Sequence, residues 1–256
     1  MNISAPRSGS SHSSSRRLKE HPLLPEVIKA FDYQSVPFWL DQGTLLGLVR
    51  DGRLIEDDHD LDLGVWEDDY KNNRAQILAK LKREGIWVEA YKPHQLSITS
   101  LGEDVPMINI AFYKRISGLA VKKMYYPGPS RLENLAVKAA LFGAHAASGR
   151  LDKKLPGGGI YRALLLLAKV IPAPAWRALS HLSGRSQYYF KPYVTMAVPE
   201  HFFLKLGDIS IDGVNLPVPA NPEAYLALKY GPDWHKPRKE WVFWEDDGAI
   251  TNQALE

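Results

Sequence analysis

The chain has 256 residues, 45% of them hydrophobic and 24% charged, which is enough for one large domain or two small ones with a substantial core. It contains no cysteine, and this excludes a disulfide scaffold, cysteine-ligated zinc, iron–sulfur clusters and a thiol nucleophile. The formal net charge of +3 is too small to indicate a nucleic-acid partner, and we expect none.

The first 17 residues are predicted to be a disordered, serine-rich tail. Seven of the thirteen residues from Ser4 to Arg16 are serine, and no apolar run of the kind found in secretory signals follows. A serine- and arginine-rich start without acids is also typical of transit peptides, so that alternative stays open. The longest apolar run, Ala163 to Ala168, ends at Lys169 and is far too short for a transmembrane helix. The absence of cysteine fits a cytosolic protein, so we expect a cytoplasmic location.

From residue 18 to residue 256 the pattern predicts one α+β domain with a helical insertion at about 131–185. A first half that mixes strands and helices precedes the insertion, and short strands with a last helix follow it. Apolar periodicity and turn residues predict helices over 22–31, 67–84, 131–148, 160–182 and 222–230, and strands over 37–41, 60–66, 86–90, 95–100 and 107–113. A short helix over 44–49 is predicted to begin with Thr44 as its cap.

Aspartates alternate with apolar residues at the start of the strand predicted over 60–66. Successive side chains of a strand point to opposite faces, so Asp58, Asp60 and Asp62 share one face while Leu61 and Leu63 share the other. Three carboxylates on one face repel one another unless a cation lies between them. Oxygen ligands suit Mg²⁺ or Mn²⁺, so we expect these three aspartates to bind one of these ions. The alternative is a solvated acidic edge.

A turn that precedes the acidic strand has the features of a phosphate site. Gly43 and Thr44 follow a predicted strand and open a helix, where backbone N–H groups can bind phosphate. Arg50, further along that helix, can add a charged fork. Alone, such a turn is more often a plain capped helix start. Because an Asp-x-Asp strand follows it, we expect Gly43, Thr44 and Arg50 to bind substrate phosphates next to the metal.

The stretch from Trp39 to Trp66 resembles the LicD/fukutin-type family, which belongs to the nucleotidyltransferase-fold superfamily. That superfamily is marked by a Gly-Ser or Gly-Thr turn followed by an Asp-x-Asp/Glu strand. The turn at residues 43–44 and the acid pair of Asp60 and Asp62 match these marks, and Asp58 matches an additional acid common in the family. The resemblance implies a mixed β-sheet flanked by helices.

A second block, from Leu216 to Trp234, is similar to the segment that closes LicD-like domains, whereas about 115–200 matches no known pattern. One position departs from the superfamily, which usually supplies a third carboxylate from a neighbouring strand. The matching residue in the strand over 107–113 is Asn109, which can ligate a metal but is a poor base. We expect Asp58 to take the missing role; a weak or inactive enzyme is the alternative.

The resemblance implies a metal-dependent transferase. The transferred group would be a phosphorylated alcohol, such as phosphocholine or ribitol phosphate. It would pass from a CDP-activated donor to a sugar hydroxyl of a surface glycan or lipid-linked glycan. Mg²⁺ (or Mn²⁺) on Asp60 and Asp62 would bridge the diphosphate, the turn and Arg50 would hold the phosphates, and Asp58 would accept the proton. The alternatives are a nucleotidyltransferase that adds NMP from NTP to a small molecule or protein, and a non-catalytic nucleotide- or glycan-binding domain.

Two further segments have simple interpretations. The apolar stretch over 160–182 carries spaced basic residues, so it is either a core helix pair or a surface for peripheral membrane association. The acidic run from Glu245 to Asp247 is expected to be a solvated surface patch.

Overall fold

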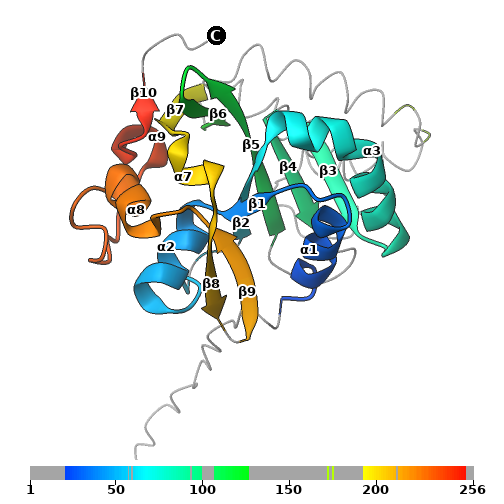
Figure 1. The fold of residues 1–256 in the computed structure, drawn as a ribbon, viewed down its shortest axis with the longest axis horizontal. Coiled ribbons are helices and arrows are strands. Elements are labelled where there is room, and N and C mark those ends of the chain that lie inside the picture. Colours follow the sequence, from blue (N-terminus) through cyan, green and yellow to red (C-terminus); the bar gives the residue numbers. More distant parts are fainter. Residues whose placement is uncertain are drawn as a thin grey trace, which may run out of the picture.

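A mixed sheet of eight strands forms the centre of the described part of the computed structural model. That part comprises residues 21–56, 58, 60–92, 94–99, 107–126, 172, 175, 193–211 and 213–251. The strand order is β1-β2-β5-β6-β7-β10, with β4 beside β5 and β3 beside β4 (Figure 1). The strands are β1 (Phe38–Leu40), β2 (Asp60–Trp66), β3 (Trp87–Lys92), β4 (Gln95–Thr99), β5 (Met107–Ile116), β6 (Leu119–Tyr125), β7 (Tyr193–Pro199) and β10 (Ile250–Thr251).

Helices flank this sheet and a separate hairpin lies beside it. Helix α1 (Leu24–Asp32) packs against α3 (Glu67–Arg83), and α2 (Gln42–Asp51) packs against α8 (Pro222–Tyr230) on the other side of the molecule (Figure 1). The remaining elements of the described chain are the hairpin of β8 (Gly207–Ile211) and β9 (Val214–Val218) and the short helices α7 (His201–Leu204) and α9 (Phe243–Asp246). The predicted α+β class, with a mixed sheet flanked by helices, is confirmed.

Most predicted elements lie where the sequence placed them, and the strand over 60–66 and the helix over 222–230 have the predicted bounds. The structure corrects the middle of the chain, where β6 and β7 form strands that the sequence did not predict. The tail at 1–17 and almost all of the helical insertion at 131–185 lie outside the described residues.

The parallel pair of β2 and β5 separates the core from the acids. Leu61 and Leu63 are 2% and 1% exposed and lie level with Ile108 and Ile110, both 0% exposed. Asp60 and Asp62, which alternate with them, are only partly buried. The alternation that predicted two faces of β2 is therefore confirmed.

A glycine on β2 makes room for the largest core side chain. Trp39 of β1 is directly opposite Gly64 and is fully buried. Its indole stacks on Phe203 with ring centroids 4.4 Å apart and meets the rings of Trp66 and Tyr113 at 5.4 and 5.3 Å. A Cβ on Gly64 would collide with the indole nitrogen and carbons of Trp39. Close packing of β1 on β2 therefore depends on the absence of a side chain at residue 64.

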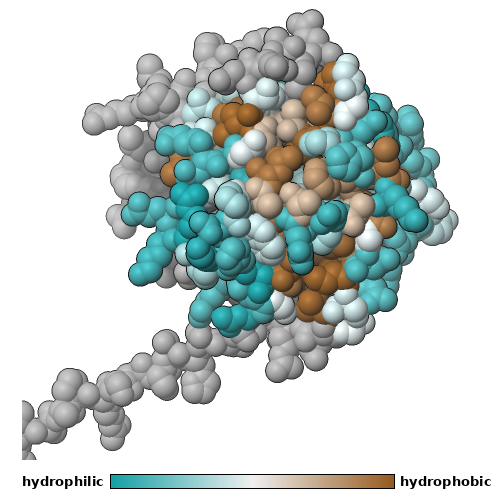
Figure 2. All heavy atoms as spheres, turned by 60° about the vertical axis from the view of Figure 1, so that its left-hand side comes forward, coloured by the Kyte–Doolittle hydropathy of each residue, from teal (hydrophilic) through white to brown (hydrophobic). Residues whose placement is uncertain are grey.

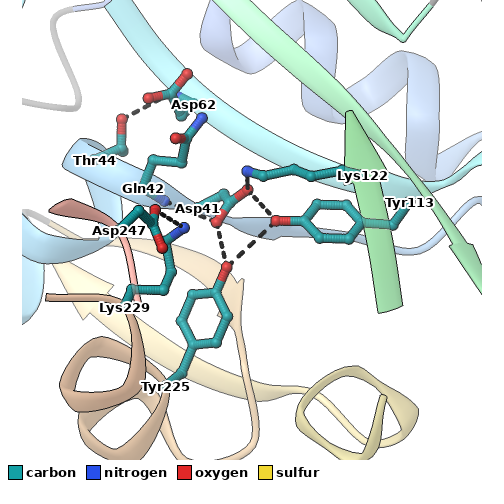
Figure 3. A network of polar contacts seen from close by, with 9 residues as sticks. All are labelled: Asp41, Gln42, Thr44, Asp62, Tyr113, Lys122, Tyr225, Lys229 and Asp247. Carbon is teal, nitrogen blue, oxygen red and sulfur yellow. Dashed lines mark hydrogen bonds and ion pairs between the residues drawn. The ribbon is translucent and has the colours of Figure 1, made fainter. Parts of the chain in front are cut away.

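A buried network centred on Asp41 joins distant parts of the chain (Figure 3). Tyr225 Oη donates to Asp41 Oδ1 at 2.6 Å. Tyr113 Oη and Lys122 Nζ donate to Oδ2 at 2.6 and 2.7 Å. Asp41 is 0% exposed and the Lys122 side chain 1%. The network thus connects the end of β1 with β5, β6 and α8.

A second buried ion pair lies beside the first. Lys229 Nζ donates to Asp247 Oδ2 at 2.6 Å, and their side chains are 1% and 2% exposed. Asp247 is therefore not part of a solvated patch, and this corrects the sequence interpretation, although Glu245 and Asp246 are exposed. The acid needed a partner 18 positions away, which local sequence does not reveal.

Charge and burial together fix the protonation of this network. Burial alone would raise the pKa of Asp41, but the ammonium groups of Lys122 and Lys229 and the hydrogen bonds that it accepts hold the pKa well below its usual range. Burial and the charge of Asp41 raise the pKa values of Tyr113 and Tyr225 well above normal, so both phenols stay protonated and donate. Two ammonium groups are thus balanced by two carboxylates in the interior.

Hydrophobic patches and hydrophilic side chains are intermixed on the face of the molecule that Figure 2 brings forward. Among the described residues, the large exposed hydrophobic side chains are Tyr33, just after α1, Leu204 of α7 and Tyr193 of β7. No helix within the described ranges is long and apolar enough to cross a membrane. The segment over 160–182, with its two interpretations, falls outside those ranges apart from two residues.

Replacing Gly64 by alanine should lower the free energy of unfolding by about 1–3 kcal/mol, because the added methyl group meets Trp39 in a core without spare volume. Urea unfolding followed by circular dichroism measures the change. Gly207→Ala is the matched control, since a Cβ there lies 3.6 Å from Val218, an ordinary contact. Equal stabilities of the two variants would contradict this account of the β1–β2 packing.

Replacing Lys122 by methionine should destabilise the fold by about 3–5 kcal/mol, because it leaves the buried carboxylate of Asp41 without its nearest cation. Lys114→Met is the control, since that side chain is 55% exposed and its loss should cost at most about 1 kcal/mol. In the double variant Asp41→Asn/Lys122→Met the loss should be smaller than the sum of the single losses. Strict additivity in the same unfolding assay would show that the two groups do not act as a pair.

Candidate functional site

The turn between β1 and α2 is built differently from the prediction. Asp41, not Thr44, caps α2: its Oδ1 accepts a hydrogen bond of 2.8 Å from the backbone N–H of Gln42. Thr44 lies in the first turn of the helix, and its hydroxyl oxygen instead accepts the backbone N–H of Asp62 at 2.8 Å. Aspartate and threonine are both suitable caps. Asp41 caps the helix here because the Thr44 hydroxyl is already bonded to β2.

Asp62 is bound to this turn through both of its backbone groups. Its N–H donates to Thr44 Oγ1 (Figure 3). Its carbonyl accepts the N–H of Asp41 at 3.0 Å. The acidic strand therefore has a fixed register against the start of α2. Because the Asp41 carboxylate is itself held from three other elements, the position of Asp62 is coupled to the whole buried network.

The three predicted acids lie near one another, but only two belong to the strand. Asp60 and Asp62 project from the same face of β2, which begins at Asp60. Asp58 precedes the strand, and its carboxylate lies against the turn: a Cβ on Gly43 would be 2.5 Å from Asp58 Oδ2. Any side chain at residue 43 would push this carboxylate away. Gly43 thus admits Asp58 to the start of α2.

Negative charge accumulates at this point of the structure. Burial raises the pKa of Asp62 well above its usual value, and the charges of Asp60, Asp41 and Asp58 raise it further, with Lys122 opposing them. Such a group of carboxylates is stabilised by a cation, and the oxygen donors present fit Mg²⁺ or Mn²⁺. Within the described residues no three His, Asp or Glu side chains are close enough to hold a metal ion, so the three-aspartate site stays a prediction.

Asn109 lies beside the acid pair. It is level with Asp62 in the parallel pairing of β5 with β2, as the sequence predicted for the missing third acid. Its side-chain nitrogen donates to Asp60 Oδ2, and its oxygen accepts a hydrogen bond of 2.8 Å from the hydroxyl of Ser97. Sequence reasoning missed Ser97, because nothing in its own strand distinguishes it from an ordinary serine.

Arg50 lies further along α2 than the other predicted phosphate-binding residues, as the sequence predicted. It lies in the last turn of α2, about 10 Å along the helix axis from Gly43 at 1.5 Å per residue. Its guanidinium makes a two-pronged ion pair with Asp51, with distances of 2.9 and 2.6 Å. Its part in holding phosphate stays a prediction. At the other end of the helix, Gly43 lies against Asp58 and Thr44 is bonded to Asp62.

Gln42 is another residue that sequence reasoning missed. Its φ of +47° lies in the left-handed region, which costs a residue with a side chain about 1–3 kcal/mol. The side chain is partly buried. Strain of this kind persists where the surrounding structure fixes the backbone, here through the Asp41 cap on one side and the Gly43–Asp58 contact on the other.

Comparison with known proteins gives a family for this part of the chain. Residues 35–134 match the family model described as the LicD/FKTN/FKRP nucleotidyltransferase domain. The matched segment includes the turn, the acid strand, Asn109 and Lys122, and it ends well before Tyr225.

Curated relatives match over short segments. An uncharacterised protein of Rickettsia typhi is 30% identical over 80 residues, which are 31% of this chain and 26% of that protein. Human ribitol-5-phosphate transferase FKTN is 41% identical over 51 residues, which are 20% of this chain and 11% of that enzyme. The chain therefore spans only a minor part of the length of either relative.

The match to a solved structure of the antibiotic-resistance factor ANT(2'')-Ia covers 68% of this chain and 95% of that chain, with 14% sequence identity and a TM-score of 0.33. The sequence matches are more specific than this likeness. Residues 35–134, with the turn and the acid strand, match the LicD/FKTN/FKRP nucleotidyltransferase domain, which confirms the resemblance seen in the sequence.

Proposed function

We propose that this chain is a metal-dependent transferase that moves a phosphorylated alcohol from a CDP-activated donor to a sugar hydroxyl of a glycan or lipid-linked glycan. The family match supports a phosphotransferase or nucleotidyltransferase type of reaction. The observation that carries the proposal is the double backbone attachment of Asp62 to Asp41 and Thr44, which holds a pair of carboxylates beside a helix start. A helix start can bind phosphate and a carboxylate pair can bind a divalent cation, so a site for both needs these two features side by side.

Each group of residues at the site has a separate role in the proposed reaction. Asp60 and Asp62 would hold Mg²⁺ or Mn²⁺, which supplies charge neutralisation for the departing CMP. The N–H groups at the start of α2 would hold the donor phosphates in line for attack, with Thr44 kept in place by its bond to β2. Asp58, whose carboxylate lies against Gly43, would accept the proton of the attacking hydroxyl.

A second candidate is a non-catalytic nucleotide- or glycan-binding domain. The observation in its favour is Asn109, an uncharged residue whose amide is directed at Asp60 and cannot act as a base. Calorimetric titration with CDP-choline, CDP-ribitol and CDP-glycerol, with and without Mg²⁺, separates the candidates when combined with a product assay. Release of CMP supports the phosphotransferase, release of pyrophosphate from an NTP supports a nucleotidyltransferase, and binding without turnover supports the second candidate.

Asp60→Asn should reduce Mg²⁺-dependent release of CMP by more than about 100-fold, because even the loss of groups that only orient metal ligands costs 10–100-fold. The melting temperature should stay close to that of the wild type, since Asp60 lies at the edge of the core. Asp208→Asn, at an exposed aspartate of β8, is the control and should retain full activity. Metal-dependent turnover that survives Asp60→Asn would rule out the proposed role of this carboxylate.

Gln42 opens α2 next to the proposed phosphate site, and we propose that its amide contacts the donor. Gln42→Gly should therefore weaken donor turnover, yet it should stabilise the protein by up to about 1 kcal/mol, because glycine adopts a positive φ without strain. Ser117→Gly is the matched control: its φ is +50° in the tight turn between β5 and β6, so it should give a similar gain in stability at unchanged activity. Thermal melts and initial rates measure both quantities. Equal activity of the two variants would mean that the Gln42 amide does not contact the substrate.

A further inference from the structure

Three strands bring a serine, an asparagine and an aspartate into one line. Ser97 of β4 is directly opposite Asn109 of β5, and Asn109 is level with Asp62 of β2. The hydroxyl of Ser97 contacts the asparagine oxygen at 2.8 Å, and the asparagine nitrogen contacts Asp60. Ser97 is 1% exposed, so water does not compete for its hydroxyl.

The chain of hydrogen bonds has a direction. Gln95 Nε2 donates to Ser97 Oγ at 3.4 Å, so the serine hydroxyl accepts there and its proton is directed at Asn109 Oδ1. With its oxygen occupied, Asn109 offers its N–H groups to Asp60. To ligate a cation through oxygen, the amide would have to turn over. The Ser97 hydroxyl would then accept from the NH₂ group, and its own proton would lose the acceptor that it has in this structure. A buried polar group left unpaired in this way is costly.

We infer that Ser97 and Asn109 are positioning residues that hold the Asp60 carboxylate through a directed hydrogen-bond relay, and that Asn109 is not itself a metal ligand. This rests on the proposed function, in which Asp60 binds a divalent cation. In the relay Asp60 Oδ2 accepts from Asn109, and Oδ1 would be the oxygen that binds the cation. Partners that orient a metal ligand typically contribute a factor of 10–100 in metal affinity.

The two roles of Asn109 predict opposite effects of removing the serine hydroxyl. In the relay, Ser97→Ala lets the amide rotate and loosens Asp60, so the affinity for a divalent cation falls. If Asn109 bound the cation through its oxygen, the bond from Ser97 would hold the amide in the orientation that cannot bind the ion. Removing the hydroxyl would then leave the affinity unchanged or increase it.

The test is a titration of the full-length protein with Mn²⁺, followed by electron paramagnetic resonance of the unbound ion. Ser97→Ala should bind Mn²⁺ about 10-fold more weakly than the wild type. Ser97→Thr, which keeps the hydroxyl, should restore the affinity. Ser210→Ala, at an exposed serine of β8, is the matched control and should bind like the wild type.

Each outcome is decisive. Unchanged or tighter binding by Ser97→Ala overturns the relay while leaving the proposed function in place, whereas a wild type that binds no Mn²⁺ overturns both. A measurement on the wild type removes any dependence on variant folding: the side-chain amide signals of Asn109, identified by their loss in Asn109→Asp, should keep their hydrogen-bonded shift when Mg²⁺ is added. A shift that collapses on addition of Mg²⁺ would show that the amide turns toward the ion.

Discussion

The Asp41 carboxylate is the interaction on which the rest of the structure depends. It is fully buried, accepts hydrogen bonds from Gln42, Tyr113, Lys122 and Tyr225, and is kept ionised by cations that are themselves buried. Taking a charge out of water is unfavourable unless every partner is in place. For this reason one side chain can fix the relative positions of the end of β1, the start of α2, two central strands and α8.

The proposed site depends on this constraint. The backbone of Asp41 holds the carbonyl of Asp62, and the helix that Asp41 caps holds the N–H of Asp62 through Thr44. The acid pair is therefore placed by a buried charge network on one side and by the Ser97–Asn109 contact on the other. Carboxylates that repel one another can be held close together only by such a rigid frame.

The sequence was most informative where local pattern decides the structure. Alternating acids and aliphatics determine β2, because each residue type prefers one face of the sheet. The Gly43–Thr44 pair was found because it opens a helix directly after a strand. Long-range partners decide the features that were missed. Asp247 was predicted to be solvated because its partner, Lys229, lies 18 positions away on α8. Ser97 is distinguished only by its position opposite Asn109.

The strands β6 and β7 were missed for a related reason. Each is stabilised by pairing with the other over seven residues, and their sequences lie on either side of a long intervening segment. Lys122, on β6, reads as a surface residue in a strand that carries two adjacent lysines. Only the fold shows that one of these lysines faces inward toward Asp41, while the other lies over the ring of Tyr193.

The balance of buried charges has a consequence for how this protein can change during evolution. Asp41, Lys122, Lys229 and Asp247 are two acids and two bases drawn from four separate places in the sequence. A single replacement among them leaves an unmatched charge in the interior. Replacements that preserve stability must therefore change an acid and a base together. Two of the four lie beyond the segment that matches the family model. Descendants of this chain should therefore inherit the quartet as a block, and a segment exchanged at residue 134 would separate its members.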